Sequence, residues 1–122
     1  MRDRPDAADL LATARKAVLD ELVPLLPPEA QYVARMAANA MAVALRELGT
    51  APADEAAERR DLRVLFGRDA DTADVADLSR RLAREIRSGR HDASAEVHAI
   101  LLADVRRRLA LCNPRAIESP PA

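Results

Sequence analysis

Residues 36–45 read Met-Ala-Ala-Asn-Ala-Met-Ala-Val-Ala-Leu, an uncharged run whose one polar side chain is Asn39. Alanine, leucine and methionine favour the helix, so the run predicts the middle of a helix that we place at 28–48. A helix that is apolar on every side has to be covered on every side. We therefore predict that helix 28–48 is the central rod of a small domain, in which Asn39 is shielded from water and needs a hydrogen-bond partner.

Prolines and glycines mark the ends of the other helices. Three prolines stand where a helix begins, and three glycines stand just after an apolar helical pattern ends. These residues are Pro5, Pro28 and Pro52, and Gly49, Gly67 and Gly89. The first four predicted helices cover residues 6–23, 28–48, 53–66 and 73–88, and Asp71 or Thr72 caps the fourth of them. The fifth predicted helix begins at Asp92 or Ser94 and ends at residue 112. Because the connections are short, we expect an all-α, up-and-down bundle of about five helices around helix 28–48.

Length and composition indicate one soluble domain. A chain of 122 residues has the size of a single domain, which we place at 4–115, followed by a flexible tail at 116–122. The lone Cys112 excludes an internal disulfide and fits a reducing compartment. The chain opens with no basic-then-apolar leader and holds no run of about 20 apolar residues, so we expect a cytoplasmic protein without a membrane span.

Polar side chains recur on one face of helix 28–48. Tyr32, Arg35 and Asn39 are spaced by three and four residues, which aligns them on one side of a helix. One interpretation is a polar pocket that faces a ligand or partner. A second is structural, with Asn39 bonded to a neighbouring backbone and the other two side chains reaching outward. A third is that Asn39 fixes the register of helix pairing or of a dimer.

The histidines offer no recognisable metal or catalytic pattern. His91 and His98 lie near Glu85, Asp92 and Glu96 in the sequence, but their spacing matches no known metal-ligand motif. No nucleophile stands in a catalytic motif beside either histidine. We therefore expect neither a metal, nor a cofactor, nor catalytic residues.

Arginine supplies every basic side chain except that of Lys16. Five arginines gather in residues 78–90, a density that is also found in surfaces that bind nucleic-acid phosphates. They are Arg80, Arg81, Arg84, Arg87 and Arg90. The segment lacks interleaved aromatic residues and a glycine-rich loop, and basic side chains also suit the negative end of a helix. Nucleic-acid binding is therefore the weaker interpretation.

The last helix carries three consecutive arginines, residues 106–108, which cannot all point in one direction. We expect at least one of them to pair with an acid from another helix. The helix then ends in Cys112-Asn-Pro-Arg, where Pro114 restricts Asn113 to extended geometry. Asn113 and Arg115 are candidates for a surface site, and the alternative is that this segment only stops the helix.

Three segments together resemble a bacterial family of small helical domains of unknown function, DUF6285. They are Arg4-Pro-Asp-Ala-Ala-Asp-Leu-Leu, Tyr32-Val-Ala-Arg-Met-Ala-Ala-Asn-Ala-Met and Cys112-Asn-Pro-Arg, so the resemblance covers residues 4–115. Members are typically encoded beside aminoglycoside-phosphotransferase-like kinases and acyl-CoA dehydrogenases. The resemblance brings no catalytic residues with it. Its recurrent positions correspond to Arg35, Asn39, Asn113, Pro114 and Arg115.

The resemblance and the missing catalytic pattern favour a non-catalytic accessory or protein-interaction module. Its expected partner is a phosphotransferase-like kinase or an acyl-CoA dehydrogenase in acyl- or hydroxy-acyl-CoA metabolism. The alternative is a small-ligand-binding bundle with a pocket for an acyl-CoA or a phosphorylated acid near Tyr32, Arg35 and Asn39. A DNA-binding regulator has less support. A second copy of the chain is a further candidate for covering part of helix 28–48.

Overall fold

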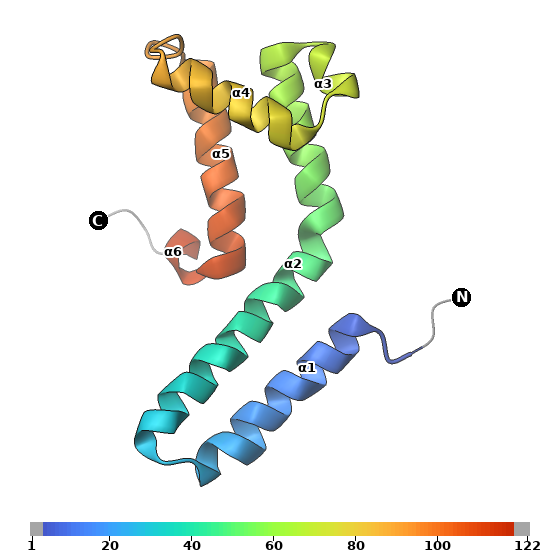
Figure 1. Cartoon of the computed structure of the whole chain (residues 1–122), viewed down its shortest axis with the longest axis vertical. Coiled ribbons are helices and arrows are strands. Elements are labelled where there is room, and N and C mark those ends of the chain that lie inside the picture. The colour runs from blue at the N-terminus through green and yellow to red at the C-terminus, as the bar shows by residue number, and fades with distance from the viewer. Residues whose placement is uncertain (1–3, 119–122) are drawn as a thin grey trace. The chain divides into compact units, whose positions relative to one another are not determined.

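The computed structural model describes residues 4–118, and every regular element in that range is helical (Figure 1). The elements in chain order are α1 (Ala7–Ala17), a π-helical turn η1 (Val18–Leu22), a 3-10 turn η2 (Val23–Leu25), α2 (Pro28–Phe66), α3 (Asp69–Thr72), α4 (Val75–Arg87), α5 (Ala95–Cys112) and α6 (Arg115–Glu118). The predicted all-α helical class is confirmed. None of the described helices is both long enough and apolar enough to cross a membrane.

The chain forms two compact units, and the boundary between them falls after Thr50, inside α2. Unit 1 comprises the described residues up to Thr50, and unit 2 comprises those from Ala51 onward. A single domain over 4–115 stays a prediction. The first three residues of the predicted tail belong to α6, and the rest of it lies outside the described residues.

The predicted break after residue 48 is wrong, because 28–48 and 53–66 belong to one helix of 39 residues. Gly49 keeps a negative φ and continues the helix, and Pro52 lies inside it. Proline in a helix interior leaves the carbonyl of residue i−4 without its usual donor. The alanines that surround Pro52 are the strongest helix formers, and they favour continuation over a break.

Unit 1 pairs α1 with the first part of α2 (Figure 1). Asp6 and Asp9 cap the start of α1 reciprocally, each side chain accepting the backbone N–H of the other residue, at 2.9 and 3.2 Å. Arg15 Nε donates to the Ala38 carbonyl of α2 at 3.1 Å, which ties the two helices together. Among the described residues of unit 1, only Val23 and Ala38 are buried.

This burial corrects the expectation for the apolar run. Ala38 is buried, but Met36, Ala37, Asn39 and Ala40 are exposed, so the helix is covered on one side in this part of the run. The sequence pattern is uniform around the helix, and it therefore cannot indicate that α1 covers just one side.

Unit 2 holds the larger core. Leu62 of α2, Leu78 and Leu82 of α4, and Val97 of α5 are buried together with Ala70 of α3. The predicted helices 73–88 and 92–112 thus supply three of these side chains, Leu78, Leu82 and Val97. The N-cap of α4 is Asp74, not Asp71 or Thr72, and Ser94 caps α5 as one of the two predicted residues.

Gly49, inside α2, and Gly67, directly after it, differ in the sign of φ. Replacing each by alanine is therefore expected to change stability in opposite directions. Gly67 has φ +58° and ends α2, whereas Gly49 is helical, and open space surrounds the position of an added Cβ at both. Gly67→Ala is expected to lower the free energy of unfolding by about 1 kcal/mol, because alanine is strained in the left-handed region. Gly49→Ala is expected to raise it by about 0.5–1 kcal/mol. Urea unfolding of the two variants tests both signs, and equal effects would contradict the assigned backbone.

Candidate functional site

One side of α2 in unit 1 presents a mainly apolar surface, which we call the α2 outer face. Successive residues of a helix turn by about 100°, so residues three and four apart share a face. The exposed residues that share this side are Tyr32, Val33, Met36, Ala37 and Ala40, with Arg35 and Asn39 along one edge. The side chains of Tyr32 and Val33 are 68% and 64% exposed.

The α2 outer face therefore contains three of the residues singled out in the sequence. Tyr32, Arg35 and Asn39 share one side of the helix, as their spacing predicts. Asn39 is exposed, so the prediction that it is shielded from water is wrong. Its amide has water available and needs no partner within the protein.

Asn113 and Arg115 lie in unit 2, at the junction of α5 and α6. The Asn113 N–H donates to the Leu109 carbonyl at 2.8 Å, and its own carbonyl accepts from the Ala116 N–H at 3.0 Å. Asn113 thus closes α5 and opens α6, which supports the helix-stop interpretation. Asn113 and Arg115 belong to unit 2, whereas the residues of the α2 outer face belong to unit 1.

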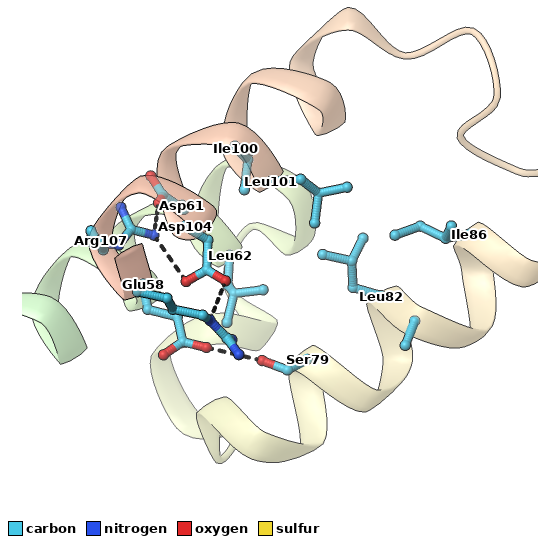
Figure 2. Close-up of a pocket in the computed structure, with 12 residues that line it drawn as sticks. Glu58, Asp61, Leu62, Ser79, Leu82, Ile86, Ile100, Leu101, Asp104 and Arg107 are labelled. Carbon is cyan, nitrogen blue, oxygen red and sulfur yellow. Dashed lines mark hydrogen bonds and ion pairs between the residues drawn. The ribbon is translucent and has the colours of Figure 1, made fainter. Parts of the chain in front are cut away.

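Unit 2 contains a pocket of about 180 Å³ between the second part of α2, α4 and α5 (Figure 2). Leu62 and Leu82 from the core reach its floor, and Ile86, Ile100 and Leu101 line its apolar side. The polar side is formed by residues from all three helices. They are Glu58, Asp61, Ser79, Asp104, Arg107 and Arg108.

Most of these charged groups are paired with one another. Arg107 donates to Asp61 at 2.8 Å and lies 3.6 Å from Asp104, and Arg108 Nε lies 2.8 Å from the second oxygen of Asp104. The contact between Arg107 of α5 and Asp61 of α2 confirms that one arginine of residues 106–108 pairs with an acid from another helix. The pair of Arg107 and Asp61 links these two helices at the pocket, whereas the contacts with Asp104 lie within α5.

A second polar cluster surrounds Glu85 of α4. Its carboxylate accepts from Arg81 Nε at 3.1 Å and from Arg90 Nη1 at 3.3 Å, and its other oxygen lies 2.9 Å from His91 Nε2. Arg81 also pairs with Asp69 of α3 and lies over the Phe66 ring, 4.3 Å from its centroid. The contact with His91, followed by that with Arg81, holds the pKa of Glu85 below its ordinary value. The cluster links three helices and the loop after α4.

Glu85→Gln is expected to make folding stability less dependent on pH in the acid range. Folding lowers the pKa of Glu85, so its charge stabilises the folded state fully above the ordinary glutamate value of about 4.3. That contribution is lost as the pH falls through the lowered value in the folded state. Urea unfolding between pH 7 and pH 3 should show the wild-type advantage shrinking. Glu55→Gln, at an exposed position of α2, is the control. An advantage that grew toward low pH would contradict the assignment.

Four of the five arginines of residues 78–90 make contacts within the protein. Arg80 pairs with Asp77, and Arg87 donates to the Ala83 carbonyl at 3.2 Å, while Arg81 and Arg90 share Glu85. These contacts reduce the positive charge that the segment offers to phosphates. His91 contacts Glu85, and residues 4–118 contain no group of three or more His, Cys, Asp and Glu side chains that is suited to a metal ion.

A family model described as a domain of unknown function (DUF6285) matches residues 24–116. The matched range contains both the α2 outer face and the pocket of unit 2, whereas the N-terminal segment that begins at Arg4 lies outside it. No curated protein and no solved structure matches the chain.

Proposed function

Because the chain belongs to the DUF6285 family, whose description states no activity, we propose from its own geometry that it is a non-catalytic protein-interaction module. The α2 outer face is the surface that would bind the partner. The observation that carries the proposal is the exposure of large apolar side chains in unit 1. They are Leu10, Leu22, Leu25, Tyr32, Val33, Met36 and Leu48, each half exposed or more.

Three of these side chains, those of Tyr32, Val33 and Met36, are exposed together on one side of α2. Contiguous apolar patches on soluble proteins mark interaction surfaces more often than chance. Tyrosine, methionine and arginine are enriched in such interfaces, and Tyr32, Met36 and Arg35 occur together on the α2 outer face. A partner that covers this face would bury apolar side chains that the small core of unit 1, in which Val23 and Ala38 are the buried side chains described, leaves exposed.

The resemblance suggests the class of partner. We propose a phosphotransferase-like kinase, or else an acyl-CoA dehydrogenase, in the cytoplasmic metabolism of acyl- and hydroxy-acyl-CoA. An accessory chain that binds such an enzyme needs no catalytic residues of its own. A second copy of the chain is the competing occupant of the same face.

Reconstitution tests the proposal. The full chain would be mixed with a purified phosphotransferase-like kinase and, separately, with a purified acyl-CoA dehydrogenase from the same organism, and complexes would be measured by light scattering after size exclusion. The proposal predicts a complex of defined stoichiometry with one of the two enzymes. A chain that binds neither enzyme, or that forms only a homodimer, would refute this partner assignment.

A second candidate function, small-ligand binding, is favoured by the pocket of unit 2. The residues that line this pocket differ from Tyr32, Arg35 and Asn39, where the sequence placed it. The pocket offers little to an anionic acyl-CoA or phosphorylated acid, because both of its arginines are already paired with carboxylates.

A further inference from the structure

We propose that the pocket of unit 2 binds a small amphiphilic amine, with an alkyl or aryl body among the leucines and isoleucines and an ammonium group at Glu58. This proposal does not depend on the protein-interaction module, because the two sites use different residues. It rests on the shape of the pocket, its apolar lining and its balance of charge.

The apolar part of the pocket determines the body of the ligand. Leu82 of α4 and Leu62 of α2 form a floor that stays in place because both side chains are buried in the core. Leu101 of α5 and Ile86 of α4 point toward each other in Figure 2, and Ile100 of α5 also belongs to the apolar lining. A volume of about 180 Å³ accommodates roughly six groups the size of water or methylene. The pocket therefore fits an unbranched chain of about six carbons or one aromatic ring.

The balance of charge determines the head group. Two carboxylates, Asp61 and Asp104, match the two guanidinium groups of Arg107 and Arg108. Glu58 is the remaining charge of the lining, and it contacts a neutral group: the Ser79 hydroxyl donates to Glu58 Oε1 at 3.2 Å. Figure 2 shows the Glu58 carboxylate beside Ser79, at the polar end of the lining. The lining thus carries one carboxylate more than it carries guanidinium groups.

An ammonium group complements this arrangement better than the alternatives do. An ionised carboxylate offers several acceptor sites, and the Ser79 hydroxyl fills one of those of Glu58. An N–H donor that is itself charged makes a shorter and stronger bond to a carboxylate than a neutral hydroxyl does. An anionic head would instead be repelled by Glu58 and would have to compete with Asp61 and Asp104 for the arginines.

Access to Glu58 comes from an adjoining groove of unit 2. Glu58, Asp104, Arg107 and Arg108 line both hollows, and Asp54 adds a further carboxylate to the groove. The head of a bound amine would therefore lie at the junction of the two hollows, and its body would extend toward Ile86.

Three matched probes test the proposal on the full chain. Hexylamine is charged at pH 7, as a lysine side chain is, whereas hexanol is neutral and hexanoate is negative. Binding is followed by amide chemical shifts in two-dimensional NMR titrations. We expect hexylamine to bind at least tenfold more tightly than hexanol, hexanoate to bind most weakly, and the shifts to gather around residues 58, 79, 83 and 101.

Variants assign the preference to the pocket. Glu58→Gln is expected to reduce hexylamine affinity about tenfold and to leave hexanol unchanged, and Glu55→Gln makes the same change outside the lining as a control. Ala83→Leu is expected to fill the pocket and abolish binding of both probes, while circular dichroism checks that each variant remains folded. The proposal is overturned if hexanoate binds as tightly as hexylamine, if none of the probes binds, or if Glu58→Gln retains the amine preference.

Discussion

Leu78→Ala is expected to lower the free energy of unfolding by about 3 kcal/mol. Leu78 is 3% exposed and packs in the core of unit 2 with Leu62, Leu82 and Val97. Its truncation removes apolar contacts and leaves a cavity, because the surrounding helices relax only in part. The loss is large relative to the total stability of a small domain. The measurement is urea unfolding followed by circular dichroism at 222 nm.

Leu102→Ala is the matched control for this loss. Leu102 lies on α5 and is 42% exposed, so truncation removes less buried surface and should cost less than about 1 kcal/mol. Equal losses at the two positions would show that the core of unit 2 does not lie where the structure places it.

Val33→Glu is expected to weaken binding of the partner enzyme by about 30-fold or more. Val33 is 64% exposed in the free protein and lies on the α2 outer face. A carboxylate at this position would be buried without a cation when the partner covers the face, which typically costs about 2 kcal/mol or more. Fluorescence anisotropy or calorimetry with the purified enzyme measures the change.

Val64→Glu is the control for that variant. It makes the same substitution in the same helix, at a side chain that is 60% exposed and lies in unit 2. The free energy of unfolding of both variants should lie within about 0.5 kcal/mol of that of the parent, because substitutions at exposed positions usually change stability little. If Val64→Glu weakened binding as much as Val33→Glu does, the partner would not bind through the α2 outer face alone.

Local signals in the sequence account for much of the fold. Ser94 and Gly67 mark helix ends through local effects on the backbone. The Ser94 hydroxyl accepts the N–H of Val97 at the start of α5, and Gly67 adopts a positive φ at the end of α2. Gly49 and Pro52 carry the same kind of signal and yet lie inside α2. Their breaking tendency is countered by neighbouring alanines, and the pattern alone does not reveal which effect is larger.

Burial depends on contacts that a local pattern does not contain. Asn39 looks shielded because its neighbours in sequence are apolar, but its position around the helix places it away from α1. The pocket is likewise absent from any local pattern, because Glu58, Ser79 and Asp104 of its lining come from three different helices. In the sequence, each of them resembles an ordinary solvated side chain. The arginines of residues 106–108 are more informative, because three adjacent side chains on a helix must point in different directions, so that at least one of them faces another helix.

Side-chain oxidation tests the central claim, that the α2 outer face binds a partner enzyme, most directly. Hydroxyl radicals would label the full chain alone and in the saturated complex, with Met36 and Tyr32 as reporters and the exposed Cys112 of unit 2 as the reference. The account predicts that oxidation of Met36 and Tyr32 falls severalfold in the complex while that of Cys112 is unchanged. Unchanged oxidation of Met36 and Tyr32 in a saturated complex would contradict it.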